Sequence, residues 1–158
     1  MDDAFVLLHT ADWHLGHSLY GTSQKEDHNL FLDWLLETIK KESADALLIA
    51  GDIFDQASPP SYARRQYFDF LLAAKKIGLK QIFILAGNHD SPSDLAAPKN
   101  LLQELFPIHY CYRLYKSNSF VFIIFYYEIF NFSSRLSRIS ILQITDISGK
   151  LYNSHLQP

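Results

Sequence analysis

The stretch Ala46-Leu-Leu-Ile-Ala-Gly-Asp-Ile-Phe-Asp55 decides the fold. Its apolar residues, 46–50, end at Gly51, and two carboxylates follow at Asp52 and Asp55. A short apolar run that stops at a turn residue is typical of a strand buried on both faces of a sheet. We therefore expect the two carboxylates to stand just beyond the carboxyl end of that strand.

The same arrangement recurs on both sides of this stretch. Residues 5–9 and 81–86 are also short apolar runs that end in turns. Each run is again followed by polar side chains: Asp12 and His14 after the first, and Asn88, His89 and Asp90 after the second. We therefore expect three strands of this kind, each followed at its carboxyl end by polar side chains that can carry chemistry.

The segments between and after these runs have the periodicity of amphipathic helices. The first helix is expected to begin at a capping box, Ser23-x-x-Glu26, and to run to about Ile39. The second is expected after Pro60 with an inner face of Tyr67, Phe68, Leu71 and Leu72, and the third over residues 95–105. The order β-α-β-α-β-α predicts an α/β fold, the N-terminal half of a layered structure with parallel strands.

Overall composition excludes several classes of protein. The chain has 158 residues, of which 48% are hydrophobic and 20% charged, so it is neither disordered nor too short for a core. Its net charge of -3 gives no general attraction to nucleic acid. A lone cysteine, Cys111, and an acidic start at Asp2 and Asp3 favour a reducing cytoplasm over secretion.

A change in composition divides the sequence after residue 106. Residues 1–106 carry nine Lys or Arg against fifteen Asp or Glu, whereas residues 107–158 carry five against two. The apolar run 120–130 is shorter than the roughly 18 residues of a membrane span and contains Glu128. We expect residues 1–106 to form one ordered part of the protein. Residues 107–158 are expected to be an atypical tail, with run 120–130 as either a buried strand or frameshifted, non-native sequence.

The strand-end residues predict a metal centre. The carboxyl ends of parallel strands lie along one edge of a sheet, so carboxylates, an amide and imidazoles converge there. Carboxylates that approach closely repel each other unless a cation holds them together. Mixed oxygen and imidazole ligands favour manganese, with iron, zinc and magnesium as alternatives. Two such ions can activate a water and clamp a phosphate, which is the logic of phosphoester hydrolysis.

Each motif also has a purely structural interpretation. Taken singly, Asp12-x-His14 is a surface turn, Asp52 is a helix cap, and Asn88-His89-Asp90 is a tight turn. Their recurrence at three successive strand ends favours the metal centre. Outside this set, His9 is expected to be a core or second-layer residue rather than a ligand. His17 and His28 are expected at the surface or in loops, with a weaker indication that His17 faces substrate.

These motifs resemble the calcineurin-like metallophosphoesterase superfamily and, within it, the bacterial SbcD nuclease subunits. The similarity lies in Asp-x-His, Gly-Asp-x-x-Asp and Gly-Asn-His-Asp, and in the stretches around them over residues 9–16, 31–37, 50–55, 58–64 and 85–91. It covers about residues 5–106, and it implies that residues 1–106 are the N-terminal part of a metallophosphoesterase (nuclease) domain. The resemblance implies a subunit that cleaves double-stranded DNA ends and hairpins with an SbcC-type ATPase, and a homodimer in the intact family.

Roles for individual residues are implied by the resemblance. Asp12 and His14 would bind one metal ion, Asp52 would bridge two ions, and Asn88 would bind the second. His89 would lie over the scissile phosphate. Asp90 would orient His89, and Asp55 would hydrogen-bond a ligand histidine.

The family also takes metal ligands from later histidines, including a Gly-His-x-His motif that this sequence lacks. Three functions therefore remain open: a DNA nuclease subunit, a phosphoesterase of small esters, and an inactive remnant with an incomplete two-metal site. We expect the 158-residue chain alone to show little or no nuclease activity with manganese.

Overall fold

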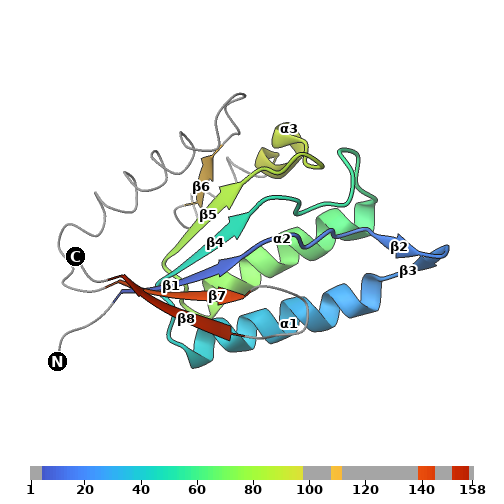
Figure 1. Cartoon of the computed structure of the whole chain (residues 1–158). Helices are drawn as coiled ribbons and strands as arrows, with labels where there is room; N and C mark the ends of the chain where they lie inside the picture. Colours follow the sequence, from blue (N-terminus) through green and yellow to red (C-terminus); the bar gives the residue numbers. More distant parts are fainter. Residues whose placement is uncertain (1–4, 98–107, 112–138, 145–150, 157–158) are drawn as a thin grey trace.

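The protein, seen in a computed structural model, has a central six-stranded sheet (Figure 1). The structure describes residues 5–97, 108–111, 139–144 and 151–156. The sheet has the strand order β6-β5-β4-β1-β7-β8, and β2 and β3 form a separate hairpin. The strands are β1 (Phe5–Thr10), β2 (Ser18–Leu19), β3 (Thr22–Ser23), β4 (Ala46–Ala50), β5 (Gln81–Leu85), β6 (Ile108–Cys111), β7 (Ile139–Ile144) and β8 (Leu151–Leu156). The helices are α1 (Lys25–Lys41), α2 (Ser61–Lys76) and α3 (Pro92–Ala96).

The three predicted parallel strands are confirmed as β1, β4 and β5. Their register is continuous, because Leu8 pairs with Leu47 and Leu47 with Ile82. The carboxyl ends of the three strands are therefore level with one another. The sheet also extends further than the sequence indicated: β6 and β7 add parallel strands, and β8 runs antiparallel to β7.

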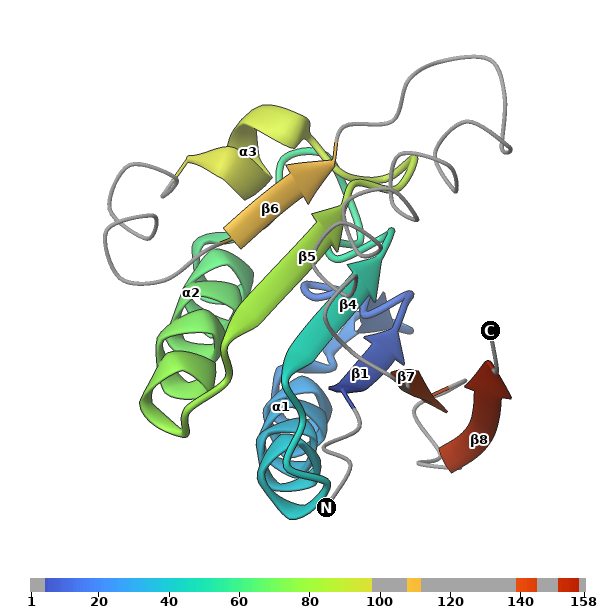
Figure 2. The ribbon, with the colours of Figure 1, turned by 90° about the vertical axis from the view of Figure 1, so that its left-hand side faces the viewer.

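Helices α1 and α2 cover one face of the sheet (Figure 2). Alternate strand residues Leu8, Leu47 and Ile82 pack against these helices in the main hydrophobic core. Their neighbours Leu7 and Phe83 point to the opposite face and belong to a second buried cluster. Both faces of each central strand are thus apolar, which explains why the sequence shows unbroken hydrophobic runs rather than alternation.

Three details of the helices differ from the sequence-based prediction. The predicted capping box is wrong, because Ser23 ends β3 and Gln24, which makes no side-chain cap, is the N-cap of α1. The Ser23 hydroxyl donates to the Tyr62 hydroxyl and accepts from the N–H of Lys25, the first residue of the helix. Leu72 is exposed, since the buried face of α2 includes Phe70 and Leu71 instead. Helix α3 begins at Pro92, where the fixed φ of proline suits a first helical residue.

Much of the second half of the chain lies outside the described residues. The expected boundary at residue 106, the run 120–130 and most of the predicted helix 95–105 fall there and stay predictions. Within the part that is described, no helix is both long and apolar enough to cross a membrane.

His28 corrects another expectation, because it is buried in α1 with only 7% of its surface exposed. Its Nδ1 has no hydrogen-bond partner among the described residues. Burial, followed by the nearby His17, lowers the pKa of His28 below its ordinary value. The folded protein therefore holds this imidazole neutral at pH values where the unfolded chain already protonates it.

This burial predicts a pH-dependent stability that His28→Gln removes. As the pH falls through about 6.5, the unfolded state takes up the His28 proton first, so the free energy of unfolding decreases. The slope due to one proton is at most about 1.4 kcal/mol per pH unit. Urea unfolding between pH 7.5 and 5 should give a flatter profile for His28→Gln than for the wild type. Parallel profiles would contradict the prediction.

Candidate metal centre

The loops that follow β1 and β4 are joined by backbone hydrogen bonds at the carboxyl edge of the sheet. The Asp12 N–H donates to the Gly51 carbonyl at 3.1 Å, and the His14 N–H donates to the Asp52 carbonyl at 2.9 Å. A parallel bridge between Leu15 and Phe54 continues this pairing. The main chain therefore fixes the relative positions of the two loops before any metal binds.

Three of the predicted ligands have unusual backbone conformations. Asp12, His14 and Asp52 have φ values of 55°, 46° and 44°. Non-glycine residues with positive φ are uncommon, and such strained positions cluster at functional sites. Tertiary hydrogen bonds hold these residues in place, so their side chains are directed by the fold rather than by local preference.

These same residues form a group that fits a divalent cation. One ligand atom each from Asp12, His14 and Asp52 lies within 4.8 Å of the other two. Two carboxylates at this separation repel each other, and a cation between them removes the repulsion. Two oxygen donors and one imidazole suit manganese or iron. The convergence that the strand ends predicted is therefore present in the fold.

Gly87 sets the position of Asp52. A Cβ atom at Gly87 would collide with both the carboxylate and the backbone nitrogen of Asp52. The Asp52 Oδ1 atom also accepts a hydrogen bond from the His89 backbone N–H at 3.0 Å. The loop after β5 thus passes directly over Asp52, and only glycine leaves room for that approach.

Gly87→Ala is expected to displace Asp52 and to weaken manganese binding by more than about tenfold, since loss of even a ligand's supporting contact costs about 10–100-fold in affinity. Gly21→Ala is the matched control, because Gly21 has a φ of 79° but no atom within 4 Å of the added Cβ. That variant should be less stable yet bind manganese normally. Isothermal titration with Mn²⁺ measures both. Equal affinities for Gly87→Ala and wild type would contradict the proposed packing.

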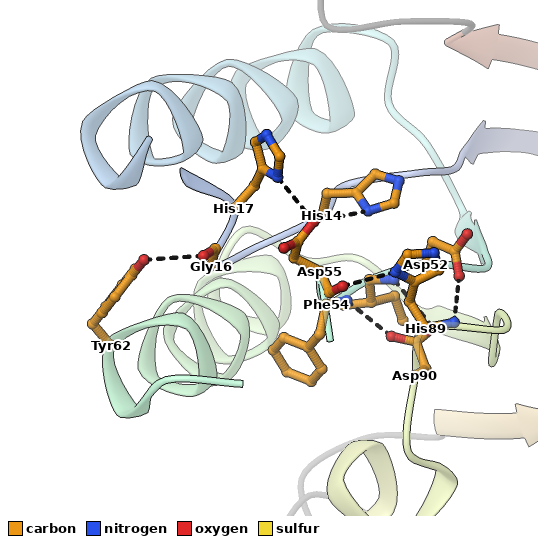
Figure 3. A network of polar contacts seen from close by, with 10 residues as sticks. His14, Gly16, His17, Asp52, Phe54, Asp55, Tyr62, His89 and Asp90 are labelled. Carbon is orange, nitrogen blue, oxygen red and sulfur yellow. Dashed lines mark hydrogen bonds and ion pairs between the residues drawn. The ribbon is translucent and has the colours of Figure 1, made fainter. Parts of the chain in front are cut away.

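Asp55 lies between two histidines of the loop after β1 (Figure 3). The His17 Nδ1 atom is 3.0 Å from the Asp55 Oδ1 atom, and the His14 Nδ1 atom is 3.6 Å from the same oxygen. Asp55 was predicted to form a hydrogen bond with a ligand histidine. In the structure it lies close to the predicted ligand His14, and its hydrogen bond is with His17. His17 lies in a loop with 45% of its side chain exposed, as expected, and it is also part of this cluster.

His89 is held by the loop after β4. Its Nδ1 atom is 2.7 Å from the Asp55 carbonyl oxygen. A carbonyl only accepts, so Nδ1 carries the proton and Nε2 is left to act on a ligand. The hydrogen bond to this carbonyl, ahead of the nearby carboxylates, raises the pKa of His89 above its ordinary value. The ring also lies edge-on to His14, with centroids 5.4 Å apart.

The buried carboxylate of Asp90 binds backbone rather than the His89 ring. Its Oδ1 atom accepts from the Phe54 N–H at 2.8 Å, and Oδ2 accepts from the N–H groups of Ile53 at 3.1 Å and Gly87 at 2.8 Å. These bonds tie the loop after β4 to the loop after β5. Asp90 therefore acts on the whole site, and a direct role in orienting His89 stays a prediction.

Asn88 is exposed in the loop after β5, next to His89. Its predicted role as a ligand of a second ion stays a prediction. His9 is half-buried, and burial lowers its pKa below the ordinary value, with Asp12 opposing the shift. Sequence reasoning missed the contact between His17 and Asp55, because no local pattern links two residues that lie 38 positions apart.

Comparison with known proteins identifies relatives of this sequence. The SbcD subunit of the nuclease SbcCD from Escherichia coli K12 is 46% identical over 96 residues, which are 61% of this chain and 24% of the relative. The SbcD subunits of the same nuclease from Bacillus subtilis and Rhodobacter capsulatus are each 42% identical, over 98 and 100 residues, which are 62% and 63% of this chain and 25% of each relative. The chain thus spans about a quarter of the length of these curated relatives.

A match to a whole protein family also covers the residues of the site. The sequence model of the calcineurin-like phosphoesterase family matches residues 5–156. This range includes β1, β4 and β5 and the loops that carry Asp12, His14 and Asp52. With nearly its whole length matched in this way, the chain belongs to the calcineurin-like phosphoesterase family.

Proposed function

We propose that this chain carries the metal-binding edge of a metal-dependent DNA nuclease subunit of the SbcD type. The observation that carries the proposal is the convergence of Asp12, His14 and Asp52 within 4.8 Å at the ends of two parallel strands. Metal-dependent phosphodiester hydrolysis is the chemistry that such an oxygen-rich group supports. The similarity to the SbcD subunits of the nuclease SbcCD supports the choice of DNA as substrate.

Each residue has a task that follows from its position. Asp12 and His14 would hold one divalent ion, Asp52 would bridge two, and Asn88 would serve the second. When bound, the ions supply the positive charge that lowers the pKa of a water and neutralises the phosphate. The carbonyl of Asp55 holds His89 through Nδ1, so in the protonated ring the Nε2–H group is free to donate its proton to the leaving oxygen.

We propose a partner subunit on two grounds, the charge of the chain and its similarity to subunits of the nuclease SbcCD. Residues 1–106 carry more Asp and Glu than Lys and Arg, so they do not by themselves attract a phosphate backbone. We propose that an SbcC-type ATPase subunit supplies part of the DNA contact, and that the intact protein is a cytoplasmic homodimer. Manganese is the proposed ion, because carboxylate oxygens suit it and it also accepts an imidazole ligand.

Cleavage of labelled hairpin DNA with millimolar Mn²⁺ tests this function, alongside a chromogenic phosphodiester. Because the Gly-His-x-His ligands are absent from the 158 residues, we expect slow cleavage that disappears in Asp52→Asn. Hydrolysis of the small diester without any DNA cleavage would favour a small-ester phosphoesterase. Complete inactivity combined with Asp52-dependent manganese binding would favour the inactive remnant. Rapid, Asp52-dependent DNA cleavage would show that the later histidines are dispensable.

A further inference from the structure

A second group of potential metal ligands lies beside the first and has different chemistry. His14, Asp55 and His89 each offer one ligand atom, and these atoms lie within 4.8 Å of one another. They come from the loops after β1, β4 and β5. Figure 3 shows the His14 and His89 rings next to each other, with Asp55 beside both. We call these three residues the nitrogen-rich group, and Asp12, His14 and Asp52 the oxygen-rich group.

The hydrogen bonds of the nitrogen-rich group prepare it for a metal. The His89 Nδ1–H donates to the Asp55 carbonyl at 2.7 Å, which leaves the lone pair of the neutral ring on Nε2. Metal-binding histidines usually donate their other ring N–H in this way, because the bond fixes the ring orientation. The ligand atom of His89 is thus selected by the fold.

His14 provides the second observation. Its Nδ1 atom is buried and has no hydrogen-bond partner among the described residues, and it lies 3.6 Å from the Asp55 Oδ1 atom. A buried polar atom without a partner is unfavourable unless an ion or a water completes it. On the far side of Asp55, His17 contacts the same Oδ1 atom at 3.0 Å and holds the carboxylate in place.

From these contacts, we propose that His14, Asp55 and His89 form a zinc site that competes with the oxygen-rich group for His14. Two imidazoles and one carboxylate, with a fourth position open, are a common donor set for zinc in proteins. Manganese prefers the oxygen-rich group, whose two carboxylates are harder ligands. Because His14 belongs to both groups, an ion in one group removes a ligand from the other.

Occupation of the nitrogen-rich group would inhibit hydrolysis. This consequence rests on the proposed function, which assigns His89 to the scissile phosphate. Zinc bound to the Nε2 atom of His89 would prevent that atom from donating a proton. It would also withdraw His14 from the manganese ion. The site would therefore make the protein sensitive to zinc at concentrations where manganese supports activity.

Substitutions in the two groups separate the sites. The 158-residue protein is titrated with Zn²⁺ by calorimetry, and with Co²⁺, whose tetrahedral complexes absorb visible light far more strongly than octahedral ones. Asp55→Asn and His89→Gln should weaken Zn²⁺ binding by more than about 100-fold and abolish the Co²⁺ bands, since losing even an outer hydrogen-bond partner costs about 10–100-fold. Asp12→Asn is the matched control in the oxygen-rich group and should retain both signals.

Circular dichroism of every variant establishes that the fold is intact. The amide side chain of Asp55→Asn can still accept the hydrogen bond from His17, and a Gln side chain at position 89 can still donate to the Asp55 carbonyl. The proposal would be overturned if the Zn²⁺ affinity fell equally in Asp12→Asn and Asp55→Asn. It would also be overturned if the Zn²⁺ affinity of Asp55→Asn and His89→Gln were the same as that of the wild type. These outcomes are independent of the proposed function, which instead fails if Mn²⁺-dependent cleavage survives Asp52→Asn.

Discussion

Asp90→Ala is expected to lower the free energy of unfolding by about 3 kcal/mol or more. The substitution leaves three backbone N–H groups, those of Ile53, Phe54 and Gly87, without their acceptor in a site where Asp90 is only 8% exposed. Each buried donor left unsatisfied costs about 1–3 kcal/mol. Urea unfolding monitored by circular dichroism measures the change directly.

Two comparisons make the Asp90 prediction specific. Asp90→Asn should also destabilise, because either orientation of the amide directs an NH₂ group at a backbone N–H donor. Asp69→Ala, at an exposed position on α2, should change the free energy of unfolding by less than about 0.5 kcal/mol. Equal stability of Asp90→Ala and Asp69→Ala would show that the carboxylate does not join the two loops.

His14→Ala is expected to have the largest effect on metal binding. His14 belongs to both the oxygen-rich and the nitrogen-rich group, so its loss should weaken Mn²⁺ and Zn²⁺ binding together, each by more than about 100-fold. His17→Ala is the comparison, because His17 contacts Asp55 without belonging to either group. This substitution should weaken the binding of the metal ions by only about tenfold. If His14→Ala lost only one of the two metals, the proposed sharing of this ligand would be wrong.

The sequence predicted the centre of the fold because its signals there are local. Unbroken apolar runs that end at Gly51 or Gly87 require buried strands, and helices between them require a parallel sheet. Convergence of Asp12, His14 and Asp52 followed from that topology alone. The β2–β3 hairpin gave no such signal, because its strands have two residues each and all four are exposed.

Tertiary contacts explain what the sequence could not predict. The pattern Asn88-His89-Asp90 places an acid beside a histidine, but the three N–H groups that Asp90 accepts from belong to residues up to 37 positions away. Likewise, nothing local shows that His28 faces inward from α1 or that His17 meets Asp55. These side chains are positioned by packing between loops, and such packing leaves no periodic trace in a sequence.

Manganese binding followed by electron paramagnetic resonance tests the central claim most directly, because bound Mn²⁺ loses the sharp signal of the free ion. The claim is that Asp12, His14 and Asp52 together form a metal centre at the carboxyl edge of the sheet. The wild-type chain should remove free Mn²⁺ at substoichiometric concentrations, and Asp52→Asn, which keeps the acceptor for the His89 N–H, should remove much less. Identical titrations of wild type and Asp52→Asn, with the fold intact in both, would contradict the claim.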